Sequence, residues 1–253
     1  ISNLINQNAK YTSSDHYVLG FQYIPSPSTI VSLEGFYKKY DNYPVSVLDQ
    51  VSLANKGADF EVLGNEDIET VGKGRSYGLE FQYQHKLTNN FYGIFSYTYF
   101  FSEFTGFDTS KYIPSVWDSR HLISFVGGYK LNKNWEISSR YRFAGKTPYV
   151  PTDLSQTLLT YPEITLDYSR LGEEKLNTFS QLDIRVDKKW NYSKWSLNIF
   201  LEVQNILAQD IPLPPEYGLN RDDQGTIINP ISLTEVEQDS GIPIPSIGIV
   251  VDF

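Results

Sequence analysis

The chain ends in the sequence Ser246-Ile247-Gly248-Ile249-Val250-Val251-Asp252-Phe253. Successive side chains of a β-strand point to opposite faces, so this run places Ile247, Ile249, Val251 and Phe253 on one face. The other face carries Ser246, Gly248 and Asp252. An apolar and a polar face in a strand that ends on an aromatic residue predict the closing strand of a transmembrane β-barrel in an outer membrane.

The same alternation recurs in segments of a length that suits a tilted membrane strand, about 9–11 residues or slightly more. It predicts an all-β, antiparallel chain with nine strands. They are expected near residues 15–24, 29–41, 75–87, 91–103, 119–131, 135–147, 179–190, 195–207 and 243–253. In the eighth segment, Phe200 alone breaks the alternation.

Alternation alone does not say which face is inside, because a soluble lipocalin-like barrel has the same period with its apolar face inward. The connections decide between the two. Tight polar links are expected near 25–28, 88–90, 132–134 and 191–194, and they alternate with long links near 42–74, 104–118, 148–178 and 208–242. Short periplasmic turns and long extracellular loops are typical of an outer-membrane barrel.

Aromatic residues gather at the predicted periplasmic strand ends, where an amphipathic ring suits the membrane interface. We interpret them as one girdle; ordinary cross-strand aromatic pairs in a soluble sheet are the alternative. The residues concerned are Tyr23, Phe91, Trp135, Trp190, Trp195 and Phe253.

Composition agrees with this reading. The chain has no Cys, which removes disulfides and thiolate chemistry, and a net charge of −9 argues against a nucleic-acid partner. No run approaches the roughly 18 apolar residues of a spanning helix. An odd strand number, the absence of Met and the absence of a signal peptide lead us to expect that residues 1–253 form the C-terminal part of a larger barrel.

Five motifs follow one another before a terminal Phe. They are Gly72-Lys73-Gly74-Arg75-Ser76-Tyr77-Gly78-Leu79-Glu80-Phe81, Trp117-Asp118-Ser119-Arg120-His121, Arg140-Tyr141-Arg142-Phe143-Ala144-Gly145-Lys146-Thr147-Pro148-Tyr149, Leu182-Asp183-Ile184-Arg185-Val186 and Val203-Gln204-Asn205-Ile206-Leu207. In this order they resemble the barrel of TonB-dependent receptors, most closely those of Bacteroidetes-type bacteria. Each motif is loose, but their order and spacing together are fairly specific.

The resemblance implies a barrel of about 22 strands that is plugged by an N-terminal domain and imports a scarce solute with energy passed on by TonB. Ferric chelates, cobalamin, glycans and peptides all remain open as the solute, and no cofactor is expected. The implied partners are outer-membrane lipid and lipopolysaccharide, TonB with its inner-membrane motor, the barrel-assembly machinery, which would read Ile249, Val251 and Phe253, and a surface lipoprotein in some cases. A passive porin-like channel without a plug is the alternative.

Charged residues on the predicted polar faces form the first group of candidate site residues. Because neighbouring strands lie about 4.8 Å apart, opposite charges can pair across the sheet. They would form either a hydrophilic wall, against which the plug docks and past which the solute moves, or simply a salt-bridged barrel interior. These lumen candidates are Glu80, Glu136, Arg140, Arg142, Asp183, Arg185, Asp187 and Glu202.

The long loops are expected to select the ligand, because rigid scaffolds commonly bind through their connections. The candidates in the 148–178 loop are Tyr149, Tyr161, Tyr168 and Arg170. In the 208–242 loop, residues 220–225 resemble the start of a calcium loop, but Ile231 stands where the bidentate Glu belongs, so an exposed turn is favoured.

Two further motifs favour structural roles. Gly72, Gly74 and Gly78 suggest a turn or bulge with unusual backbone angles before a strand that begins near Arg75. Residues 117–121 open a strand, where capping is favoured over ligand contact. An enzyme is disfavoured, because a triad of His121 with Ser119 or Ser124 lacks an identifiable orienting group.

Overall fold

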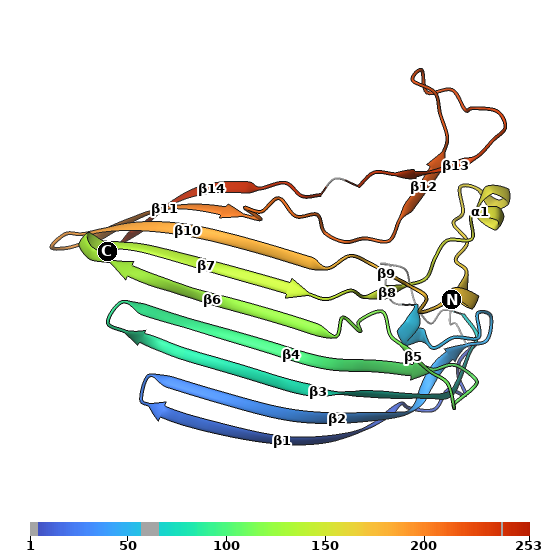
Figure 1. The fold of residues 1–253 in the computed structure, drawn as a ribbon, viewed down its shortest axis with the longest axis horizontal. Coiled ribbons are helices and arrows are strands. Elements are labelled where there is room, and N and C mark those ends of the chain that lie inside the picture. Colours follow the sequence, from blue (N-terminus) through green and yellow to red (C-terminus); the bar gives the residue numbers. More distant parts are fainter. Residues whose placement is uncertain (1–4, 57–65, 239) are drawn as a thin grey trace.

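The computed structural model describes residues 5–56, 66–238 and 240–253. Nine long strands form one antiparallel sheet, and each strand pairs with the long strand before it in the chain (Figure 1). They are β1 (Ser13–Ser26), β2 (Thr29–Ser46), β3 (Ile68–Thr88), β4 (Phe91–Thr105), β6 (His121–Leu131), β7 (Trp135–Ala144), β10 (Phe179–Asn191), β11 (Ser196–Gln204) and β14 (Ile244–Asp252). The nine predicted strands and the antiparallel fold class are confirmed.

The two kinds of connection lie at opposite ends of the sheet, as predicted (Figure 1). At one end are tight links, among them the short helix η2 (Asn132–Asn134) between β6 and β7. At the other end, the long links hold the short strand β5 (Tyr112–Pro114), the hairpin of β8 (Pro148–Tyr149) with β9 (Glu174–Lys175), and the hairpin of β12 (Glu216–Leu219) with β13 (Leu233–Val236). They also hold helices η1 (Leu53–Asn55), α1 (Leu154–Thr160) and η3 (Tyr168–Arg170).

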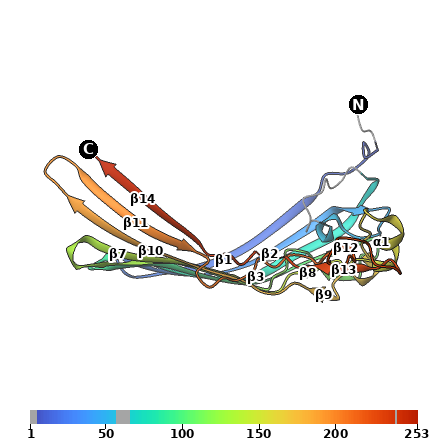
Figure 2. The ribbon, with the colours of Figure 1, turned by 90° about the horizontal axis from the view of Figure 1, so that it is seen from above.

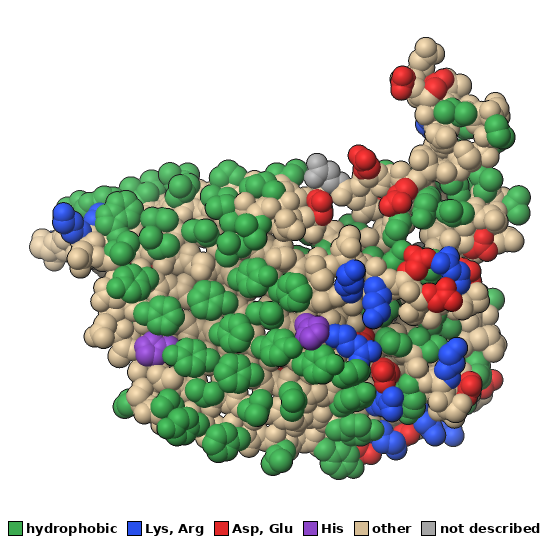
Figure 3. All heavy atoms as spheres, in the orientation of Figure 1, with side chains coloured by type: hydrophobic (Ala, Val, Ile, Leu, Met, Phe, Trp, Pro, Cys, Tyr) green, Lys and Arg blue, Asp and Glu red, His purple; other side chains and the backbone are tan. Residues whose placement is uncertain are grey.

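The sheet is curved, and its convex face is covered with apolar side chains (Figures 2 and 3). One row across this face joins Leu33, Phe81, Tyr97 and Ile123, each opposite the next. The next row along the strands joins Glu34, Glu80 and Thr98, and it points to the concave face. We call these the outer face and the inner face.

The buried core lies at the loop end of the molecule and not at the centre of the sheet. Its members are Val45, Val51, Ala54, Phe104, Val116 and Val150, and none of them is more than 8% exposed. By contrast, Ile247 is 76% exposed and Leu19 is 83% exposed on the outer face. A soluble sheet would bury such side chains, so their exposure fits a face that meets hydrocarbon.

The glycine-rich run contains no turn, but a bulge lies beside it. β3 begins at Ile68 and continues through Gly72, Gly74 and Gly78, and none of these three has a positive φ. The register with β2 shifts twice: between Tyr40 and Tyr43 the extra residue is on β2, where Asn42 has a φ of 56°, and between Tyr43 and Val45 it is on β3, next to Gly72. Glycine is needed in β3 for space: a Cβ at Gly78 would lie 2.3 Å from the carbonyl oxygen of Tyr99.

The predicted girdle residues lie near the tight-turn end of the sheet; five of them are partly exposed, and Phe253 is fully exposed. Trp135 begins β7 and is 43% exposed, while the ring of Trp195 stacks on Tyr192 at a centroid distance of 4.3 Å. Lys188 places its ammonium 5.2 Å from the ring centre of Trp135. No helix in the described ranges is long and apolar enough to cross a membrane.

Candidate functional site

A cleft of about 750 Å³ opens between the long loops. Three connections line it: the β2–β3 loop, the β7–β10 loop and the β11–β14 loop. Their lining residues are Asn55 and Lys56 from the first, Tyr149, Val150, Pro151, Thr152, Leu154, Ile164, Leu166, Tyr168, Arg170 and Glu174 from the second, and Leu213, Pro214, Pro215, Glu216 and Tyr217 from the third. We call this the loop cleft.

The β8–β9 hairpin supplies one wall of the loop cleft. Tyr149 pairs with Glu174 across this hairpin, and the phenol donates a hydrogen bond of 2.5 Å to Glu174 Oε2. Arg170 donates to the other carboxylate oxygen of Glu174 and, at 3.2 Å, to Glu173. Burial, the hydrogen bond to Glu174 and that carboxylate's charge raise the pKa of Tyr149 to about 12, so the phenol is uncharged at neutral pH.

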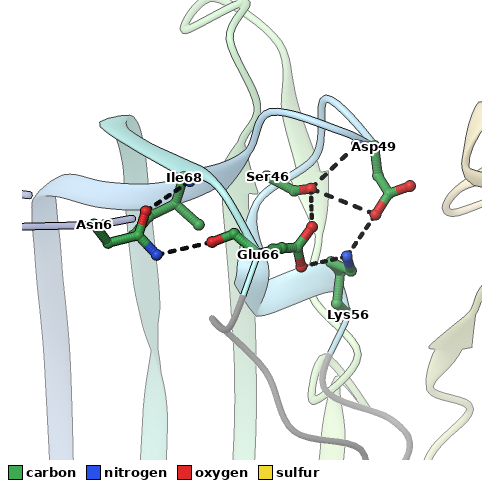
Figure 4. A network of polar contacts seen from close by, with 6 residues as sticks. All are labelled: Asn6, Ser46, Asp49, Lys56, Glu66 and Ile68. Carbon is green, nitrogen blue, oxygen red and sulfur yellow. Dashed lines mark hydrogen bonds and ion pairs between the residues drawn. The ribbon is translucent and has the colours of Figure 1, made fainter. Parts of the chain in front are cut away.

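A second polar cluster fixes the β2–β3 side of the loop cleft (Figure 4). The ammonium of Lys56 lies 2.5 Å from Asp49 Oδ2 and 2.5 Å from Glu66 Oε1, and Ser46 also donates to Glu66. The Lys56 side chain is only 12% exposed. Its ammonium also lies 5.4 Å from the ring centre of Tyr168, which joins this cluster to the β7–β10 loop. Burial lowers the pKa of Lys56, but the hydrogen bonds to Asp49 and Glu66 and the charge of Asp49 outweigh it, and the net pKa is raised.

The structure brings together Tyr149, Tyr168 and Arg170 of the four predicted loop candidates. Tyr161 caps the end of α1 and does not line the loop cleft. Sequence reasoning missed Lys56, Glu216 and Tyr217. Tyr217 follows a proline-rich run in a long loop, and that signal was available. Nothing in the sequence distinguishes Lys56 from other loop lysines.

Most lumen candidates lie on the inner face of β7, β10 and β11. Asp183 is 4% exposed and accepts hydrogen bonds from Arg140, from Gln181 and from the backbone N–H of Asn205. Arg142 donates to Gln181 at 2.8 Å. Arg185 forms a two-pronged pair with Asp187 and lies 3.7 Å from Glu202. Glu136 accepts a hydrogen bond of 2.5 Å from the phenol of Tyr92 on β4.

Glu80 is in a different setting. It stands directly opposite Glu34 on β2, and like charges in this position repel. Within the ranges that the structure covers, neither carboxylate has a hydrogen bond or an ion pair. The two line a hollow of about 520 Å³ on the inner face together with Gln22, Ser32, Gln82, Ser96 and Thr98.

The other predicted motifs have structural partners. Asp118 is 1% exposed and accepts from the backbone N–H of Ser102, while Arg120 Nε lies 3.1 Å from Asp118 Oδ1. His121 lies 2.9 Å from the Tyr97 hydroxyl and stacks on that ring. In the β12–β13 connection, Asp222 accepts from the N–H groups of Gln224 and Thr226, and Gly225 has a φ of 81°. These residues form an exposed turn.

Metal ligation has no support in the part of the chain described. No group of three or more His, Cys, Asp and Glu side chains there is arranged to hold an ion. The cleft therefore offers aromatic, aliphatic and ion-paired groups to a ligand. Ile249 and Val251 lie on the outer face of the edge strand β14, and Phe253 follows directly after this strand and is fully exposed.

An apolar outer face, a polar inner face and a loop cleft at one end define the wall of an outer-membrane barrel. A family model described as TonB dependent receptor-like, beta-barrel, matches residues 2–206, and the chain belongs to this family. The family comprises receptors and transporters of the outer membrane. Comparison with curated protein sequences gives no match.

Solved structures show the same fold. The pyoverdine outer membrane receptor FpvA of Pseudomonas aeruginosa PAO1 is 14% identical, with a TM-score of 0.57 over 96% of this chain and 30% of its own. The ferric citrate transporter FecA is 16% identical, with a TM-score of 0.55 over 94% of this chain and 31% of its own. The ferric-catecholate import receptor Fiu of E. coli K12 is 12% identical, with a TM-score of 0.55 over 89% of this chain and 27% of its own. The chain thus spans about a third or less of these proteins.

Proposed function

We propose that the chain is part of a TonB-dependent outer-membrane importer whose loops bind a scarce solute outside the membrane. The loop cleft is the observation that carries this proposal. It is large enough for a small ligand, since ligand sites commonly measure about 300–1,000 Å³. It also lies at the loop end of the sheet, where a solute arriving from outside would meet the barrel first.

The inner face supports a plugged barrel over an empty one. Glu34 and Glu80 repel each other on a polar wall, and their carboxylates have no cationic partner in the described residues. We propose that a plug domain outside this chain presents a basic side chain to this pair. Arg140 and Arg185 already have carboxylate partners of their own, so the remaining lumen candidates would form the wall past which the solute moves.

The family also sets the proposed partners. TonB would supply the energy through the plug, and the barrel-assembly machinery would insert the strands into a membrane of lipid and lipopolysaccharide. One similar structure is titled as a complex of FpvAI with pyocin S2. By analogy in fold, the exposed loops would be the surface that such an extracellular partner reaches. A surface lipoprotein over the loop cleft is a further candidate partner.

The test combines the mass and the conductance of the protein extracted from outer membranes. An importer should be several hundred residues longer than this chain, contain a globular domain, and give no steady conductance in a planar lipid bilayer. Glu34→Gln combined with Glu80→Gln should loosen the plug and produce open-channel events. Steady open pores in the unaltered protein would instead identify a passive porin-like channel.

A further inference from the structure

The charges around the loop cleft show what kind of ligand it accepts, and this inference rests on the proposed function. Both cations that line it are already neutralised. Lys56 is shared by Asp49 and Glu66, and Arg170 is shared by Glu173 and Glu174. Each of these two clusters holds two carboxylates for one cation, so each carries a net negative charge.

A third negative charge comes from Glu216, which begins β12 and lines the loop cleft. Its carboxylate has no ion pair or hydrogen bond among the described residues. Its neighbour Tyr217 stands opposite Glu235 in the β12–β13 hairpin, and burial together with the charges of Glu235 and Glu174 raises the pKa of Tyr217. Among the described residues that line the cleft, no cation is left unpaired to balance these carboxylates.

Much of the remaining lining is aliphatic, and several of these side chains are exposed. Leu154, Ile164 and Leu213 are 45%, 44% and 53% exposed, although all three line the cleft. Pro214 and Pro215 continue the same apolar surface. Covering these side chains would remove apolar area from water, at about 25 cal/mol per Å².

We propose that the loop cleft binds an organic cation with a large apolar part, of the kind presented by a short peptide with apolar and basic residues, and that Glu216 receives its positive charge. An anionic chelate would meet three net negative groups and, among the described lining residues, no unpaired cation. A neutral glycan would leave the exposed Leu and Ile side chains without an apolar partner. Charge and lining thus favour the same class of ligand.

The test uses three tripeptides, each acetylated and amidated: Leu-Leu-Lys, Leu-Leu-Gln and Leu-Leu-Glu. Their binding to the whole protein, purified from outer membranes in detergent, is measured by calorimetry at low salt. We expect Leu-Leu-Lys to bind about fivefold more tightly than Leu-Leu-Gln, as one partly exposed ion pair provides, and Leu-Leu-Glu to bind more weakly still.

Variants of the protein test whether Glu216 is the residue that receives the positive charge of the peptide. Glu216→Gln should remove the preference for Leu-Leu-Lys and leave the affinity for Leu-Leu-Gln unchanged. Glu237→Gln, an exposed acidic residue of the same loop outside the cleft lining, is the matched control and should retain the preference. Leu213→Ser should weaken all three peptides to a similar degree.

Binding of Leu-Leu-Glu as tight as that of Leu-Leu-Lys, or no binding of Leu-Leu-Lys, would overturn the inference. The outcome is independent of the conductance and mass measurements that test the importer. If the protein is plugged and gives no steady conductance but does not bind Leu-Leu-Lys, only the proposed class of ligand is contradicted. A steadily open pore would contradict the proposed function itself.

Discussion

Aromatic rings on the inner face lie against glycines of the neighbouring strand. Phe200, the residue that breaks the alternation in β11, pairs with Gly248, and a Cβ there would lie 2.2 Å from its ring. The guanidinium of Arg185 sits 3.6 Å from the centre of the same ring. Phe104 lies over Gly74 and Tyr92 over Gly128 in the same way. These rings cover backbone that a polar wall would otherwise leave bare.

Gly78 should tolerate no side chain, because the atoms in its way are the carbonyl oxygen of Tyr99 and the Cα and Cβ atoms of Phe100 on β4, which move only with the backbone. Gly78→Ala is expected to lower the free energy of unfolding by about 1–3 kcal/mol. Thermal unfolding followed by heat-dependent gel mobility would measure the change. Gly35→Ala on the adjacent strand is the control, since its Cβ would meet a Leu79 side-chain carbon at an ordinary 3.4 Å. Equal effects of the two substitutions would refute the steric explanation.

Asp183 accepts hydrogen bonds from three donors and so connects β7, β10 and the residue after β11 on the inner face. Asp183→Ala leaves Arg140, Gln181 and the N–H of Asn205 without their acceptor and should cost about 2–3 kcal/mol of stability. Denaturant unfolding in detergent is the measurement. Asp252→Ala should change little, because its side chain is 65% exposed and lies 3.9 Å from Lys189. A mild effect at Asp183 would show that the network is replaceable by water.

At the scale of elements, the membrane strands could be predicted from period and turn spacing, but the loop elements could not. β8 and β9 have two residues each, and α1 has seven, too few to show a period. They are held by contacts distant in sequence, such as the bond between Tyr149 and Glu174. The sequence indicated Tyr149, Tyr168 and Arg170 as ligand candidates because they lie in one long loop. It did not indicate Lys56 or Glu216, because contacts distant in sequence bring their loops to the same cleft.

The β8–β9 hairpin should weaken in alkali. The pKa of Tyr149 is raised to about 12 from the ordinary 10, so the hairpin holds the uncharged phenol. Its stabilisation should be complete below pH 10 and disappear as the pH rises to about 12. The difference in phenolate absorbance between the protein and Tyr149→Phe measures this titration. A difference curve with its midpoint at the ordinary value would show that the contact with Glu174 does not persist in solution.

At the scale of the whole molecule, the exposed apolar outer face makes insertion into a membrane a condition of stability. Phe253 ends the chain on this face and is expected to act in assembly. Phe253→Ser should reduce the amount of folded barrel in outer membranes severalfold, whereas Asp252→Asn should not. Quantitative immunoblotting of heat-modifiable protein would measure both. A normal amount of folded barrel in the Phe253→Ser variant would show that Phe253 has no role in assembly.

The order of strands in the sheet has a consequence for how the chain acquires its structure. Each long strand pairs with the long strand before it, from β1 to β14. Every pairing therefore closes a loop no longer than the connection between the two strands, and the entropy of closure grows only slowly with that length. The sheet can accordingly grow by one hairpin at a time, with an edge that always offers hydrogen bonds to the next segment. A kinetic study should find early protection from hydrogen exchange in the four hairpins with tight turns, β1–β2, β3–β4, β6–β7 and β10–β11, and later protection where long loops must close.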